Sequence, residues 1–232
     1  MSEQHVLDNP VRSALLGPHA HFAVRSGSVL RYPPDVCPFI ALPDGPDPGA
    51  WADLAALVGP DATAAVSAPR IAPPPGWEVV ADIPGVQLVD AGVAAEPDPG
   101  AVVLGPADVP QMLALVERTR PGPFLPRTIE MGTYLGIRHD GDLVAMAGER
   151  LHPPGWTEIS AVCTDERHRG RGLAARLVRA VAAGIRERGE TPLLHAAASN
   201  VDAIRLYEKL GFTLRRHTRF DAVRLIADEA VA

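Results

Sequence analysis

The 232-residue sequence is poor in lysine, cysteine and long apolar runs. Lysine occurs once, at Lys209, and the residues L-G follow it, so the G-K-[ST] core of a P-loop is absent. Two cysteines, Cys37 and Cys163, cannot form a disulfide framework and are typical of a reducing compartment. Apolar runs such as 178–185 are too short to span a bilayer, and no basic region precedes an apolar segment at the N-terminus. We therefore expect a cytoplasmic protein without a signal peptide or a membrane anchor.

Positive charge is scarce in one part of the chain only. The net charge of −6 argues against a general nucleic-acid binder. However, residues 1–100 hold 12 acidic and 4 basic residues, whereas residues 101–232 hold 16 acidic and 18 basic ones. The first hundred residues also contain 16 of the 24 prolines. These differences predict an N-terminal lobe over 1–95 and a second domain over 96–232, which is the part suited to an anionic ligand.

Hydrophobic periodicity predicts an α/β (α+β) chain. In the first part, short apolar runs predict strands at 21–24, 28–32, 39–42 and 77–83 and one helix over Pro48–Val58. After residue 100 the predicted order is β-α-β-β-β-α-β-α-β, with a hairpin at the Asp140-Gly141 turn. Ser199 and Asp202 fit a capping box that opens the last helix.

The most informative segment is 158–175, which reads E-I-S-A-V-C-T-D-E-R-H-R-G-R-G-L-A-A. A strand leads through a basic loop to Gly170 and Gly172 and directly into a helix, an arrangement that aims backbone N–H groups at a phosphate. The same glycines also satisfy a G-x-G-x-x-A dinucleotide fingerprint. Five residues separate the strand from Gly170, and the next strand ends without a ribose-binding acid, so the dinucleotide reading is disfavoured.

Two motifs together resemble the GNAT superfamily of acetyl-CoA-dependent N-acetyltransferases over residues 101–225. The first is the R-x-x-G-x-G loop after the V-x-T strand end. The second is Asn200-x-x-Ala203-x-x-x-Tyr207-x-x-x-Gly211-Phe212. The resemblance implies a mixed, mostly antiparallel sheet with a splayed strand pair at the cofactor site. It also implies that the smaller N-terminal lobe is a degenerate GNAT-like or lid half on the acceptor side.

The resemblance further implies which residues bind acetyl-CoA. The end of the splayed strand, Val162, Cys163 and Thr164, would receive the pantetheine arm. Asn200 would contact the cofactor arm, and Tyr207 would protonate the CoA thiolate. The loop amides would hold the pyrophosphate, and this loop consists of Arg167, His168, Arg169, Gly170, Arg171, Gly172, Leu173 and Ala174.

A protonated amine must lose a proton before it attacks a thioester, so a carboxylate or a water chain is needed nearby. Glu158 is the first candidate base, because on a regular strand it lies on the same face as Val162, four residues on. Glu149, at the end of the neighbouring strand, is the second. The backbone N–H of Val162 is the candidate donor to the oxyanion. Cys163 is expected to be a small strand residue, and no nucleophile is required.

The sequence therefore predicts an acetyltransferase that moves acetyl from acetyl-CoA to an amine by direct attack. Amino acids, polyamines, aminoglycosides and protein N-termini all remain open as acceptors. We expect a monomer or a homodimer without nucleic-acid or membrane partners. We expect no metal either, because the histidines of the second part lack ligand spacing. The alternative is a CoA-binding sensor or assembly module that keeps the fold but not the turnover.

Overall fold

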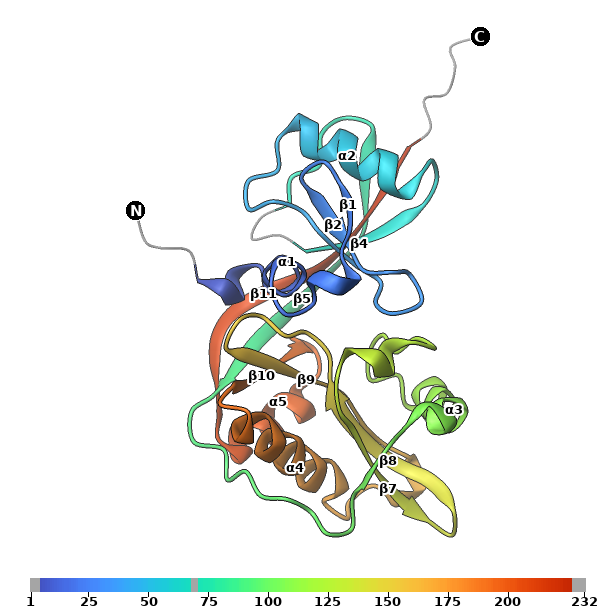
Figure 1. Cartoon of the computed structure of the whole chain (residues 1–232), viewed down its shortest axis with the longest axis vertical. Helices are drawn as coiled ribbons and strands as arrows, with labels where there is room; N and C mark the ends of the chain where they lie inside the picture. The colour runs from blue at the N-terminus through green and yellow to red at the C-terminus, as the bar shows by residue number, and fades with distance from the viewer. Residues whose placement is uncertain (1–4, 68–70, 227–232) are drawn as a thin grey trace.

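The computed structural model describes residues 5–67 and 71–226 (Figure 1). One 11-stranded sheet runs through this part of the chain in the order β1-β2-β3-β4-β11-β5-β10-β9-β8-β7-β6. Its strands are β1 Val24–Ser26, β2 Val29–Arg31, β3 Phe39–Ala41, β4 Thr63–Ser67, β5 Trp77–Asp90, β6 Val102–Val103, β7 Tyr134–His139, β8 Asp142–Glu149, β9 Trp156–Thr164, β10 Thr191–Ala197 and β11 Phe212–Leu225. The α-helices are α1 Pro10–Leu16, α2 Pro48–Val58, α3 Val109–Thr119, α4 Leu173–Glu187 and α5 Val201–Leu210.

Two long strands connect the first part of the chain to the rest of the molecule. β5 and β11 pair antiparallel from Trp77–Leu225 to Asp90–Phe212, and Figure 1 shows them running from beneath α2 down to α5. At its far end β5 also pairs with β10, so it lies between β10 and β11. The sheet is therefore continuous between the two parts, and the predicted division at residues 95/96 stays a prediction.

The strand predicted over 77–83 continues to Asp90, through Pro84 and Gly85. Proline lacks an N–H and usually breaks a central strand. The carbonyl of Pro84 accepts the N–H of Ala198, so the side of the residue that lacks an N–H faces the end of β10 rather than β11. Regular pairing with β10 starts only at Gly85, which explains why the proline is tolerated.

The element order predicted after residue 100 is confirmed, as is the mixed sheet. Only β3–β4 and β9–β10 among the described strand pairs are parallel. α4 buries Leu177, Val181 and Ile185 against one face of β7–β10, and α3 buries Met112 and Leu115 against the other. The two helices accordingly lie on opposite sides of these strands in Figure 1.

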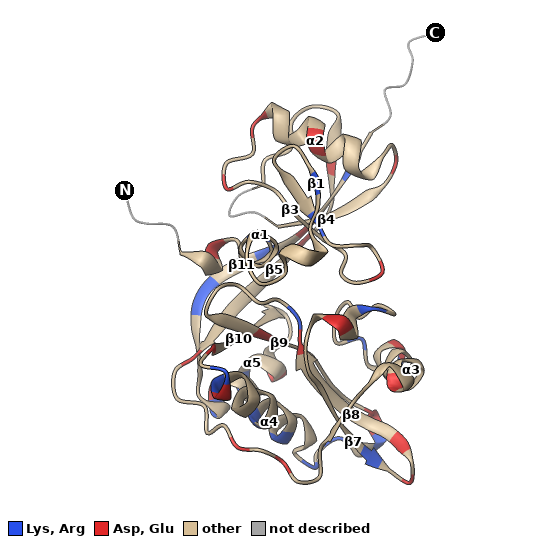
Figure 2. Ribbon diagram, in the orientation of Figure 1, with Lys and Arg blue, Asp and Glu red and all other residues tan. Residues whose placement is uncertain are grey.

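The segment 91–101 follows the outside of α4. Three arginines of that helix form ion pairs with acids at or just before this segment, and Figure 2 shows the two charge types facing one another there. The pairs are Arg176–Asp98, Arg179–Glu96 and Arg186–Asp90. The positive charge of these arginines is therefore partly neutralised by the segment that enters the domain.

Some local predictions are wrong. Asn200, not Ser199, is the N-cap of α5, and its side chain accepts the N–H of Ala203. The strand expected at 21–24 is a 3-10 turn followed by β1. α1 and β4 were not predicted, because each is short and lies between prolines. α2 has the predicted bounds. No helix of the described residues is long and apolar enough to cross a membrane.

The central position of β5 makes it a sensitive point for stability. Leu88 is fully buried in the core beneath α4, so Leu88→Ala should lower the free energy of unfolding by about 2–5 kcal/mol. Val79→Ala, on the exposed part of the same strand, should cost less than about 1 kcal/mol. Urea unfolding of both variants measures this difference. An equal decrease in the free energy of unfolding for both variants would contradict the central role of β5.

Candidate active site

The parallel strands β9 and β10 separate part-way along their length. Their pairing runs from Trp156–Thr191 to Ile159–Leu194 and ends there, while β9 continues to Thr164 and β10 to Ala197. Backbone groups on the facing sides of the two strand ends therefore have no partner strand. This is the splayed pair that the sequence predicted, and it includes Val162, Cys163 and Thr164.

A β-bulge in β9 changes the direction of these residues. Ser160 pairs with Gly148 and Cys163 with Met146, so Ala161 and Val162 together oppose Ala147. Ala161 has φ +52°, an uncommon conformation for a residue other than glycine. The extra residue reverses the alternation of the strand.

The expectation that Glu158 and Val162 share a face is therefore wrong. Cys163 lies in the core beneath α3, and Val162 packs against the core beneath α4. Glu158 lies on the same face as Ser160, which is the α3 face. The strand thus presents Glu158 to one side of the sheet and Val162 to the other.

The glycine loop ends in an uncapped helix. Gly170 and Gly172 have φ +77° and +72°, and a Cβ built on either would meet no atom within 4 Å. Gly172 is the N-cap of α4 and has no side chain that could bond the first helical amides, including those of Leu173 and Ala174. The positive end of the helix is therefore open to an anion.

The first part of the loop uses its amides internally. The N–H groups of Arg167 and His168 bond to Asp165, and that of Arg169 bonds to the carbonyl of Glu166. Among the predicted loop residues, those from Gly170 to Ala174 thus remain the best placed for a pyrophosphate. Beside this loop lies a hollow of about 470 Å³, whose polar lining includes Gln111, Arg118, His139, Asp140, Asp142, Asp165, Arg167 and His168.

Tyr207 lies on α5, which follows β10. The side chain is buried, and its ring meets that of Phe212 edge to face at 6.3 Å. Burial, with a smaller electrostatic contribution from Cys163, raises the pKa of Tyr207 to about 12. The phenol is therefore protonated at neutral pH. Burial also raises the pKa of Cys163 to about 11, which keeps it a thiol.

Glu158 is buried, and its carboxylate has charged and polar partners on both oxygens. Arg150 donates from Nε to Oε2 at 3.0 Å and from Nη2 to Oε1 at 2.7 Å, and His195 Nδ1 lies 2.8 Å from Oε1. Burial alone would raise the pKa of Glu158, but the Arg150 charge and the bonds from His195 and Arg150 outweigh it and hold the pKa well below the usual range.

The contacts of Glu158 continue across the sheet toward the N-terminal lobe. Gln87 Nε2 lies 2.9 Å from His195 Nε2 and donates to the carbonyl of Leu7, while Arg215 donates to Gln87 Oε1. Since the amide nitrogen donates, His195 Nε2 accepts, and the proton of a neutral His195 is on Nδ1 and faces Glu158. The carboxylate is thus bound by residues of β10 and of the segment after β8.

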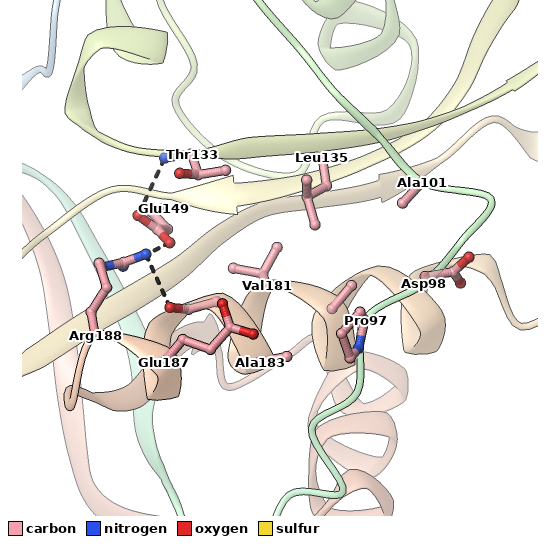
Figure 3. A pocket seen from close by; sticks show the side chains of 12 residues that line it. Pro97, Asp98, Ala101, Thr133, Leu135, Glu149, Val181, Ala183, Glu187 and Arg188 are labelled. Carbon is pink, nitrogen blue, oxygen red and sulfur yellow. Dashed lines mark hydrogen bonds and ion pairs between the residues drawn. The ribbon is translucent and has the colours of Figure 1, made fainter.

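Glu149 lies elsewhere. It pairs with Ile159 across β8 and β9, so its side chain is on the α4 face, opposite that of Glu158. There it accepts hydrogen bonds from Arg188 at 2.9 Å and from the backbone N–H of Thr133 at 3.2 Å (Figure 3). It lines a hollow of about 260 Å³ between α4 and the segment that contains Pro97 and Ala101. The structure therefore does not bring the two predicted bases together.

Comparison with known proteins decides the family. The FR47-like protein family model matches residues 134–220. A crystal structure of a protein from Novosphingobium aromaticivorans DSM 12444, assigned to the GNAT family as an acetyltransferase, is 45% identical, with a TM-score of 0.88. The match covers 97% of this chain and 100% of the other. The chain belongs to the GNAT family.

Two further acetyltransferases resemble the chain less closely. The spermine/spermidine N(1)-acetyltransferase of Bacillus subtilis (strain 168) is 26% identical over 104 residues, which cover 41% of this chain and 68% of the relative. A GCN5-related N-acetyltransferase from Kribbella flavida has a TM-score of 0.61 over 94% of this chain and 95% of its own, at 21% identity. The latter supports the fold alone.

The partners of Glu158 were not predicted. His195 is one of the histidines that lack ligand spacing in the sequence, and Arg150 follows the predicted base Glu149 without a motif of its own. Both reach Glu158 through strand pairing, which a single sequence does not reveal. Alternation along β10 would have placed His195 on one face, but not its partner.

Removal of the Glu158 charge should leave the Arg150 guanidinium buried without its partner. Glu158→Gln should therefore cost about 3–5 kcal/mol at pH 7, whereas the double variant Arg150→Met/Glu158→Leu should recover most of the loss. Because the folded-state pKa is lowered, this stabilisation is complete above the ordinary value of 4.5 and is lost as the pH falls below it. Unfolding measured from pH 7 to pH 3 should show the wild type and Glu158→Gln converging. A constant difference would contradict the assignment.

Proposed function

We propose that this GNAT protein transfers an acetyl group from acetyl-CoA to a primary amine by direct attack on the thioester. The observation that carries the proposal is the gap between the ends of β9 and β10, which has the open N-terminus of α4 beside it. A pantetheine arm could pair with the unpaired strand edge while the helix terminus binds the pyrophosphate.

Two further features support acetyl-CoA as the donor. The buried hydroxyl of Thr164, where β9 enters the loop, has no hydrogen-bond partner among the described residues. The open backbone at Gly170 and Gly172 leaves space for a close approach of phosphate oxygens. Val162, Thr164 and the amides from Gly170 to Ala174 would hold the cofactor. Asn200, which caps α5, remains the proposed contact to its arm.

The chemistry would proceed through a tetrahedral intermediate. The amine nitrogen attacks the thioester carbon, and the Val162 N–H at the bulge is the proposed donor to the oxyanion. As the carbon–sulfur bond breaks, Tyr207 donates its hydroxyl proton to the CoA sulfur. The attacking nitrogen releases its extra proton to water as the amide forms, and Tyr207 regains a proton from solvent. Its place on α5, the helix that follows β10 directly after the gap, supports this role.

The contacts of the two carboxylates bear on the proposed base. Glu158 can take up a proton only at the expense of its bonds to Arg150 and His195, and Glu149 lies on the other face of the sheet. Glu158 therefore remains a candidate base of low proton affinity, and Glu149 the less favoured one. We propose that the amine loses its proton to water before it attacks. Glu158, paired with Arg150 and His195, would then contribute a fixed negative charge near the site rather than accept the proton.

Acceptor identity can be approached by assay. Purified protein would be incubated with acetyl-CoA and a panel of polyamines, amino acids, aminoglycosides and N-terminal peptides, with detection of free thiol and mass spectrometry of products. Spermidine is tested first, because the matched Bacillus subtilis relative is named as a spermine/spermidine N(1)-acetyltransferase. Acetylated product supports the enzyme. Tight CoA binding without product from any amine favours the sensor.

A matched pair of glycines tests the pyrophosphate site. Gly172 and Gly189 lie at opposite ends of α4, with φ +72° and +76° and open space around each. Gly172→Asp should weaken CoA binding at least tenfold, because the carboxylate would repel the pyrophosphate. Gly189→Asp should have similar backbone strain but leave CoA affinity unchanged. Isothermal titration measures both, and equal affinities would refute this site.

The general acid has its own test. Tyr207→Phe should lower kcat by about 10²–10⁴-fold, the usual range for loss of a proton donor, and leave the CoA dissociation constant nearly unchanged. The ring remains, so its packing on Phe212 is retained. Steady-state kinetics at saturating acetyl-CoA and a CoA titration provide the two numbers. An unchanged kcat would remove Tyr207 from the mechanism.

A further inference from the structure

Tyr134, at the start of β7, has a buried hydroxyl that the proposed reaction does not use. The residue is 1% exposed, and the oxygen has no hydrogen-bond partner in the described part of the chain. A buried unsatisfied polar group costs about 1–3 kcal/mol, and a phenylalanine would fill the same space without this cost. The hydroxyl therefore points to a ligand contact.

The backbone around Tyr134 is arranged to hold its ring. Tyr134 pairs with Gly148 on β8, and Gly148 pairs with Ser160 on β9. A Cβ on Gly148 would lie 2.2 Å from Tyr134 Cδ1, so only glycine at this position lets the ring lie across β8. Phe124 also packs edge to face with the ring, with centroids 5.3 Å apart.

This row of residues ends where β9 leaves β10. The β9–β10 pairing stops at Ile159, and Ser160 is the next residue, directly before the bulge at Ala161. The row also lies on the face of Glu158, because Ser160 and Glu158 are two residues apart on a strand. A ligand at the proposed reaction centre could thus approach the row from the α3 face.

The charged groups near Tyr134 already have partners. Arg150 and Glu158 influence its ionisation, but they bond to one another, and Glu158 also bonds to His195. Their opposite charges offset one another at the hydroxyl, and Glu149, which also acts on it, is paired with Arg188. Burial raises the pKa of Tyr134, which keeps the group a neutral donor and acceptor. Such surroundings favour an uncharged amine over an ammonium ion.

We propose that the Tyr134 hydroxyl is a substrate contact that hydrogen-bonds to the nitrogen of the acceptor amine and orients it toward the thioester. This inference rests on the proposed function and assigns a role on the acceptor side of the same site. The phenol oxygen accepts an N–H of the neutral amine, which leaves the nitrogen lone pair free to attack. No bond of Tyr134 is made or broken.

The experiment compares Tyr134→Phe with Tyr32→Phe, a matched control. Tyr32 is also fully buried, but its hydroxyl lies 2.9 Å from His19 Nδ1 in the N-terminal lobe. Each variant would be assayed for Tm, the CoA dissociation constant, and kcat and KM for the best amine. Tyr134→Phe should lower kcat/KM for the amine at least tenfold, with CoA affinity within twofold of the wild type and Tm unchanged or higher. Tyr32→Phe should lower Tm and leave the amine kinetics unchanged.

The outcomes separate this inference from the proposed function. Unchanged amine kinetics in Tyr134→Phe, with an active wild type, would overturn the inference alone. A loss of CoA affinity with unchanged amine kinetics would also overturn it. So would a lower Tm in both variants with equal losses of kcat/KM for the amine. A wild type that acetylates no amine would overturn the proposed function and this inference with it.

Discussion

The structure depends on how β9 and β10 are held together at one end and allowed to separate at the other. Glu158 and His195 join the two strands through a hydrogen bond at the point where their pairing ends, and Arg150 binds the same carboxylate from the β8 side. A buried carboxylate is stable only while such partners surround it. These contacts hold β9 and β10 together beside the gap. The bulge, the glycine loop and Tyr207 lie around that gap.

The features that the sequence predicted well are local ones. The Asp140-Gly141 turn, the glycines before α4 and the periodicity of α4 depend on residues close together in the chain, and the structure has all three. The spacing from Gly172 to Tyr207 led to the GNAT family for the same reason. Each of these signals lies within three consecutive elements at most.

The features that escaped prediction are nonlocal or differ by a single residue. One extra residue at Ala161–Val162 moves Glu158 to the face opposite Val162, and no residue type marks that bulge in the sequence. The Arg150–Glu158–His195 contacts join separate strands. The insertion of β5 between β10 and β11 depends on pairing over more than a hundred residues. Strand pairing, rather than propensity, decides each of them.

The long antiparallel pair of β5 and β11 has a consequence for the way the molecule comes apart. Each strand contributes 14 residues, and the two extend from the sheet beneath α2 to the core beneath α4. Because both lobes contain part of β5 and β11, unfolding of one lobe removes hydrogen-bond and packing partners from strands that the other lobe also needs. We therefore expect a single cooperative unit, in which heat or denaturant melts both lobes in one transition despite their different compositions.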